Sequence, residues 1–154
     1  MRLFAFVVLL FVGCSYKSTT ISLPIAKKDA TYITIHHAPF EGYILDKDKK
    51  IPIKLSGSFA KYLEDLLLQS QKPLQPYTIN VKISKLQALY WASRGKVFVK
   101  VRLFVKLAQK GVLKQKSIEV VRIANATRFT FKKKLQLLLL DAAKEIVGII
   151  EELL

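Results

Sequence analysis

The strongest constraint on the fold is the alternation in residues 96–107, KVFVKVRLFVKL. Apolar residues occupy every second position from Val97 to Leu107, and three cations and two phenylalanines fill all the positions between them. Side chains alternate between the two faces of a strand, whereas a helix repeats every 3.6 residues or so. The stretch therefore predicts a long central antiparallel strand with one core face. The opposite face either meets water or binds something.

Other segments supply partners for this strand. Three more segments alternate and are predicted strands: residues 31–37, 77–85 and 114–123. Two segments repeat their apolar residues at three and four, and are predicted helices: residues 56–71 and 130–154. Residues 38–53 contain two prolines and a glycine, and we expect a loop there with at most a short strand.

The order of these elements, β-α-β-β-β-α, predicts an α+β fold. We expect a two-layer sandwich in which about four antiparallel strands carry both helices on one face. The predicted core face of the sheet consists of Ile79, Val81, Val97, Val99, Val101 and Leu103.

Residues 1–13, MRLFAFVVLLFVG, have the form of a secretory signal peptide. Arg2 precedes an apolar run that is too short to span a bilayer. The run ends at Gly13–Cys14, which resembles the lipobox of bacterial lipoproteins. That resemblance implies that Cys14 is diacylated and becomes the mature N-terminus. The alternative is a buried, inert cysteine behind an apolar anchor.

We divide the chain into three parts on this basis. Residues 1–13 are the signal peptide, residues 14–29 a mostly polar lipidated tether, and residues 30–154 a single domain. Ser15, rather than an aspartate, follows the cysteine, and this resembles lipoproteins that are sent to the outer membrane. We expect a cell-envelope location facing the periplasm, with the inner membrane as the alternative.

The charge distribution points to an anionic partner. The net charge is +15, and between residues 66 and 140 sixteen Lys or Arg residues accompany a single acid, Glu119. Such an excess attracts nucleic acid, an acidic membrane surface or phosphorylated lipid, although it can also serve solubility alone. An exported lipoprotein meets little nucleic acid, so we expect an anionic lipid or lipopolysaccharide.

The outward face of the central strand is the candidate binding site. It presents aromatic rings between cations, namely Phe98, Lys100, Arg102, Phe104 and Lys106. This mixture suits a ligand with a phosphate and an apolar body. The alternative is a solvated face on which the rings pack against lysine stems.

No residue pattern indicates catalysis or a cofactor. His36 and His37 are neighbours in a predicted strand and should point to opposite faces, so they cannot easily share a metal ion. Cys14 is the single cysteine, which leaves no intrachain disulfide and no cysteine-based metal site. The sequence has no phosphate-binding loop, nucleophile elbow or dinucleotide fingerprint, and we predict a non-enzyme.

A lipobox followed by β-α-β-β-β-α resembles three families of small envelope lipoproteins. They are the auxiliary lipoproteins of MCE-type ABC transporters, which carry phospholipid, the lipopolysaccharide-assembly lipoprotein (LptE) family and the YajG-like lipoproteins. Residues 32–45 look most like the first family, and residues 83–99 look most like the third. The resemblance implies a non-enzymatic accessory component of envelope lipid or lipopolysaccharide transport or assembly, with an envelope protein partner. The alternative is a structural or surface lipoprotein that acts as a protein-interaction module without a lipid ligand.

Overall fold

Three long antiparallel strands form the frame of the molecule. The computed structural model describes residues 16, 19–24, 32–70 and 77–154, so Cys14 lies outside the described residues. Within them, β5 (Thr78–Trp91), β6 (Lys96–Gln109) and β7 (Val112–Asn125) make a continuous meander of fourteen-residue strands. Gly95 and Gly111 lie in its two connections, and both have a positive φ that a glycine adopts without strain.

Four shorter strands extend the sheet beyond β5. Two of them, β2 (Ile33–His36) and β3 (Phe40–Asp46), pair in succession with the same edge of β5, and both run parallel to it. The next strand, β4 (Lys49–Ser56), forms a hairpin with β3, and β1 (Thr19–Ser22) pairs parallel with β4. The result is a seven-stranded mixed sheet.

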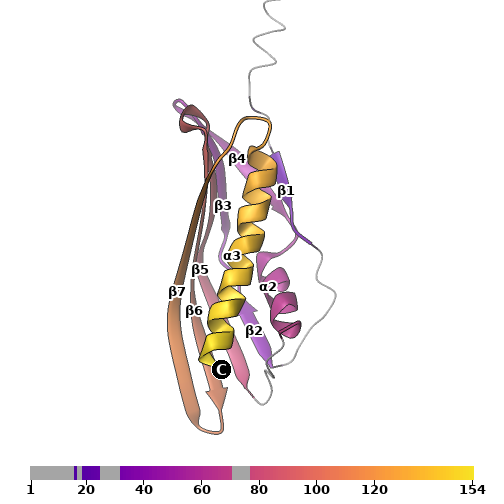
Figure 1. Ribbon diagram of the computed structural model, residues 1–154, viewed down its shortest axis with the longest axis vertical. Helices are drawn as coiled ribbons and strands as arrows, with labels where there is room; N and C mark the ends of the chain where they lie inside the picture. Colours follow the sequence, from indigo (N-terminus) through magenta and orange to yellow (C-terminus); the bar gives the residue numbers. More distant parts are fainter. Residues whose placement is uncertain (1–15, 17–18, 25–31, 71–76) are drawn as a thin grey trace, which may run out of the picture.

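The two α-helices of the described residues lie on one face of this sheet (Figure 1). The long helix α3 (Phe131–Leu153) runs along the sheet and packs on β6 and β7, while α2 (Phe59–Leu68) packs on α3 and β2. Ser58 caps α2 by accepting a hydrogen bond from the backbone N–H of Lys61 at 3.2 Å. A short 3₁₀ turn, η1 (Ala92–Arg94), joins β5 to β6.

The core lies between α3 and the valine-rich face of β6. The predicted core residues of β5 and β6 are buried, and so are Leu135, Leu139, Ala142, Ile146 and Ile150, which follow one another along one face of α3. Burying such side chains contributes roughly 1.5–3 kcal/mol each. At the rim of this layer, Arg122 of β7 forms an ion pair with Glu145 of α3.

The structure corrects the predicted four-stranded antiparallel sandwich. The chain is α+β, but the sheet has seven strands and is mixed, so the predicted order β-α-β-β-β-α is wrong. The error lies in residues 38–53, where prolines suggested a loop and the structure has β3 and β4. Pro39 sits in the link between β2 and β3, and Pro52 lies just before the segment of β4 that pairs with β1. Proline has no N–H to donate to a neighbouring strand. It is compatible with a strand at a position where no neighbouring strand needs that hydrogen bond.

The segment expected to be a tether, residues 14–29, also contains regular structure. Residues 19–22 form β1, whose Ile21 is buried against the core. The ring of Tyr16 lies edge-on to Tyr90 and Phe131, with centroids 5.8 and 6.0 Å apart. The chain therefore joins the domain well before residue 30.

Val101→Asp should unfold or nearly unfold the domain. Val101 is fully buried under α3, and an unpaired buried carboxylate costs several kcal/mol, on the order of the whole stability of a small domain. The measurement is thermal unfolding followed by circular dichroism. Val112→Asp is the matched control, because the Val112 side chain is 60% exposed. A Val101→Asp melting temperature within a few degrees of wild type would contradict this assignment of the core.

Candidate functional site

The sheet face that the helices leave uncovered, hereafter the open face, carries all five predicted binding residues. On β6, the valines and leucines point under α3, and the residues between them point to the open face. The strands on either side continue this face, since directly paired residues share a side of the sheet. The open face divides into an apolar, an ion-paired and a basic zone along β6.

The first zone is a hollow of about 280 Å³ near the β5–β6 turn, hereafter the apolar hollow. It is lined by Leu45, Leu89, Trp91, Lys96, Val97, Phe98 and Ile123. Cross-strand pairing aligns Leu89, Phe98 and Ile123 in one row and places Trp91 beside Lys96 in the next. Trp91 is 43% exposed and Ile123 60% exposed, so the hollow is open to an apolar ligand.

Two cations border the apolar hollow. The guanidinium of Arg94 lies 4.2 Å from the centroid of the Trp91 ring, which is within the range of a cation–π contact. Lys96 lines the hollow itself. A ligand with an apolar body would thus find positive charge at the mouth.

The second zone consists of Lys100, Arg102 and Glu119, which are ion-paired with one another. Arg102 Nε donates a hydrogen bond to Glu119 Oε2 at 2.9 Å, and Lys100 Nζ lies 3.7 Å from Glu119 Oε1. The hydrogen bond from Arg102, and then the charge of Lys100, lower the pKa of the Glu119 carboxyl. The carboxylate therefore stays charged at neutral and weakly acidic pH, and the pairs are lost only as the pH falls through the lowered pKa. The protein's own Glu119 thus occupies the place between the two cations where the sequence suggested a ligand.

The third zone is a smaller hollow of about 190 Å³, hereafter the basic hollow. It is lined by His36, Asn80, Lys82, Phe104 and Lys106. The parallel pairing of β2 with β5 sets His36 beside Lys82, and Lys106 lies 5.7 Å from the centroid of the Phe104 ring. None of the residues that line this hollow is acidic, so an anion there would meet the positive charges of Lys82 and Lys106.

The structure separates residues that the sequence pattern grouped together. Phe98 belongs to the apolar hollow and Phe104 to the basic hollow, six positions away on β6. At about 3.4 Å per residue, that spacing is roughly 20 Å. The two rings cannot flank one headgroup, although an extended amphiphile could reach from one hollow to the other.

Several lining residues were missed from the sequence. Leu89, Trp91 and Ile123 come from strands where the alternation gives way to apolar residues on both faces, as in ALYW and VVRI. Apolar residues on both faces of a strand were the sequence feature that could have predicted an apolar site on the open face. No sequence signal pointed to His36 beside Lys82, because their pairing depends on a parallel strand alignment.

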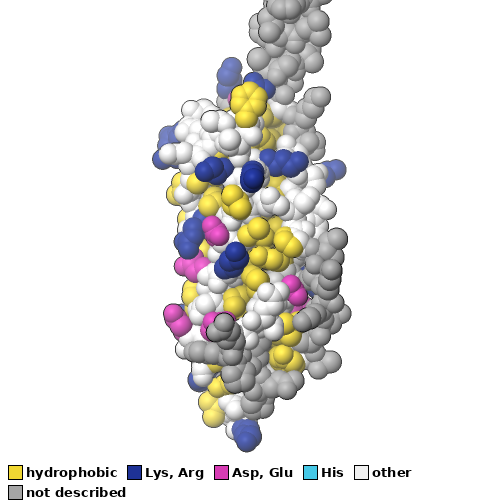
Figure 2. Space-filling view, turned by 45° about the vertical axis from the view of Figure 1, so that its right-hand side comes forward, with side chains coloured by type: hydrophobic (Ala, Val, Ile, Leu, Met, Phe, Trp, Pro, Cys, Tyr) yellow, Lys and Arg dark blue, Asp and Glu magenta, His cyan; other side chains and the backbone are white. Residues whose placement is uncertain are grey.

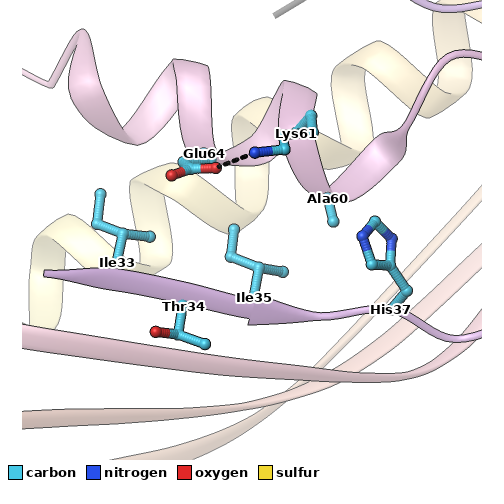
Figure 3. A pocket seen from close by; sticks show the side chains of 7 residues that line it. All are labelled: Ile33, Thr34, Ile35, His37, Ala60, Lys61 and Glu64. Carbon is cyan, nitrogen blue, oxygen red and sulfur yellow. Dashed lines mark ion pairs between the residues drawn. The ribbon is translucent and has the colours of Figure 1, made fainter. Parts of the chain in front are cut away.

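A further hollow of about 290 Å³ lies on the helix side, between β2 and α2 (Figure 3). Ile33 and Ile35 point toward α2, and the ring of His37 points toward Ala60 and Lys61. Lys61 Nζ lies 3.7 Å from the Glu64 carboxylate, which is 8% exposed. Lys61 and Glu64 thus line the hollow with opposite charges that compensate each other.

The two histidines point to opposite sides of the sheet, as predicted, with His36 in the basic hollow and His37 near α2. Among the described residues, no group of His, Cys, Asp and Glu is placed to hold a metal ion. None of the helices in the described part of the chain is long and apolar enough to cross a membrane.

Comparisons with known proteins leave the function open. No protein-family model matches the chain, and no curated protein matches it. One similar solved structure is that of a protein described only as uncharacterized. It shares 10% sequence identity at a TM-score of 0.45, over 88% of this chain and 99% of that one.

Glu119→Gln should increase the affinity of the open face for anionic amphiphiles by roughly two- to five-fold. It removes the carboxylate that pairs with Lys100 and Arg102, and an exposed, solvent-screened pair of this kind has only a modest effect. The double change Lys100→Glu with Arg102→Glu should weaken binding, because it replaces both cations with carboxylates beside Glu119. The measurement is titration of the full chain with phosphatidylglycerol in non-ionic detergent.

A matched control separates local from net charge. Lys110→Glu with Lys144→Glu changes the net charge equally, but Lys110 lies in the β6–β7 turn and Lys144 on α3. If all three variants bind like wild type, the Lys100–Arg102 zone is only a solvated surface.

Proposed function

We propose that the protein is a lipid-anchored envelope lipoprotein whose open face binds an anionic amphiphile. It serves as a non-enzymatic accessory component of an envelope lipid or lipopolysaccharide transport or assembly system. The signal-like residues 1–13 and Cys14 supply the anchor, and an envelope protein supplies the partner. The site resides on β6 and its neighbours.

The observation that carries this proposal is the apolar hollow. Soluble domains rarely leave Trp, Phe, Leu and Ile side chains together in an open depression of the sheet. Here those residues come from β3, β5, β6 and β7, and register aligns them in neighbouring rows. Their apolar surface has no helix over it, so a ligand is the natural cover.

The positive charges beside the apolar hollow favour a ligand that carries a negatively charged group. Lys96 and Arg94 lie at the mouth, and the basic hollow lies roughly 20 Å further along β6. An acyl chain has a comparable length, and a phosphate suits lysine and arginine donors. Phospholipid and lipid A share this chemistry of apolar chain plus phosphate.

A second function is favoured by a different observation, the free edge of β7. Within the described sheet, β7 pairs with β6 alone along fourteen residues, and Val112, Leu113, Val121 and Ile123 are exposed on it. A long unpaired edge with exposed apolar side chains at both ends offers a place for an added strand from another protein. On this alternative the protein is an interaction module without a lipid ligand.

Ile123→Asp should weaken the binding of phosphatidylglycerol by roughly ten-fold, because it puts a carboxylate into the apolar hollow in place of an apolar contact with the ligand. Binding is followed through Trp91, the chain's only tryptophan, which lines the same hollow. Val112→Asp is the control, since Val112 is equally exposed but lies at the other end of β7. Phosphatidylcholine and lipid A titrations show whether the headgroup matters. Equal affinities for wild type and both variants would favour the interaction module.

Cys14→Ser should abolish lipidation and leave the signal peptide uncleaved. The reason is that only the cysteine thiol can carry the diacylglyceryl group that a lipobox implies. The measurements are the intact mass of the purified protein and its distribution between membrane and soluble fractions. An unchanged mass and fractionation would contradict the anchor and leave the open-face proposal to be judged by Ile123→Asp.

A further inference from the structure

The connection between β7 and α3 exposes an aromatic ring that no contact in the core requires. Phe129 is 87% exposed, the most of the large hydrophobic side chains among the described residues. The guanidinium of Arg128 lies 5.6 Å from its ring centroid. The backbone there is held in place, because Thr127 Oγ1 accepts a hydrogen bond from Phe129 N at 3.2 Å and Thr127 O accepts one from Phe131 N at 2.9 Å. The exposure of Phe129 is therefore built into the turn.

Three lysines follow at a place where they disfavour the helix. Lys132, Lys133 and Lys134 occupy the first turn of α3, and all are exposed. The N-terminal end of a helix carries a partial positive charge, so acidic residues stabilise it and cations destabilise it. No Asp or Glu occurs from residue 120 to residue 140. Folding alone does not account for this choice of residues.

The N-terminal segment meets the domain at the same end. Tyr16 packs edge-on against Tyr90 and Phe131, whose rings stack at 4.4 Å, and Arg128 lies 5.6 Å from the Tyr16 ring centroid. Burial and Tyr16 raise the pKa of the Tyr90 hydroxyl, so that hydroxyl stays neutral at physiological pH. Cys14 precedes Tyr16 by two residues in the sequence, and two residues of chain span at most about 7 Å.

The space-filling view supports this grouping. Figure 2 shows Lys and Arg side chains, with an exposed hydrophobic ring, gathered toward the upper end of the face that it presents. Most of the Asp and Glu side chains visible on that face lie further down. The start of α3 and the β7–α3 connection are at this upper end in Figure 1.

We propose that this end of the domain docks onto an anionic bilayer surface. The docking surface consists of Arg128, Phe129, Lys132, Lys133 and Lys134, hereafter the basic end. The cations contact lipid phosphates, and the Phe129 ring enters the interfacial region of the bilayer. The inference deepens the proposed function and rests on its anchor at Cys14.

Docking would set the apolar hollow next to the membrane. Lys96 of that hollow pairs with Asn125, the last residue of β7 before the β7–α3 connection. The opposite end of β7, at Val112, lies roughly 45 Å away along the strand. A lipid leaving the bilayer would therefore reach the apolar hollow first and the basic hollow afterwards.

The test places a tryptophan at the proposed contact. Phe129→Trp is made in a Trp91→Phe background, and the purified full-length lipoprotein is reconstituted into vesicles that contain brominated phosphatidylcholine, with or without phosphatidylglycerol. We expect a blue-shifted emission and about two-fold or more stronger quenching when the anionic lipid is present. Val112→Trp in the same background is the control, and its quenching should not depend on the anionic lipid. Equal quenching at position 129 in both vesicles, or equal quenching at both positions, would overturn the proposal.

A charge-reversal variant separates docking from folding. Lys132→Glu, Lys133→Glu and Lys134→Glu together should reduce the quenching of a tryptophan at position 129 to the level in neutral vesicles. The same variant should melt at a higher temperature than wild type, because acidic residues suit the first turn of a helix. Unchanged quenching together with the raised melting temperature would overturn the docking surface.

The outcome is distinguishable from failure of the proposed function. Loss of phosphatidylglycerol binding in detergent on Ile123→Asp reports on the apolar hollow, and the mass of the protein reports on Cys14. The position-129 probe reports on orientation at the bilayer alone. A protein that is lipidated and binds phosphatidylglycerol, but shows no anionic-lipid effect at position 129, keeps the proposed function and loses the docked orientation.

Discussion

The packing of α3 on the core face of β6 is the contact on which the rest of the structure depends. Every second residue of β6 from Val97 to Leu107 is buried, and the facing stripe of α3 from Leu135 to Ile150 is buried with them. Because these residues of β6 face the helix layer, the residues that alternate with them along β6 point to the open face. That alternation places on the open face the β6 residues that contribute to the apolar hollow, the Glu119 ion pairs and the basic hollow.

The same alternation explains what the sequence could predict. The extents of β6, β7 and α3 lie close to those that local periodicity predicts, whereas β5 continues to Trp91, beyond the alternation that predicted a strand over residues 77–85. Parallel pairing has no such local signature. The contacts of β2 and β3 with β5 join residues far apart in the sequence, with β4 and α2 between them along the chain.

The predicted binding residues show the same difference between local and long-range information. Phe98, Lys100, Arg102, Phe104 and Lys106 could be assigned to one face of one strand from the sequence, because a strand fixes its own two sides. Their division among three zones could not be predicted from the sequence, because the neighbours that define each zone come from other strands. Glu119 of β7 forms ion pairs with Lys100 and Arg102, and His36 of β2 lies with Lys82 and Lys106 in the basic hollow. A residue's face is a local property, whereas its electrostatic surroundings are set by the register of the sheet.

The first turn of α3 adds a different kind of evidence, in which local stability and surface chemistry disagree. The apolar stripe of α3 holds the helix in place whatever its first turn contains, so three lysines there are tolerated at a cost of a few tenths to about 1 kcal/mol each. Because core packing offsets this cost, the residues of the first turn can be suited to a partner outside the domain. The neighbouring Phe129 is likewise unnecessary for packing, and Tyr16 brings the N-terminal segment to the same place. Two features that folding does not require, the lysines and Phe129, thus meet at the end of the molecule where Tyr16 packs, and a shared external surface accounts for both of them.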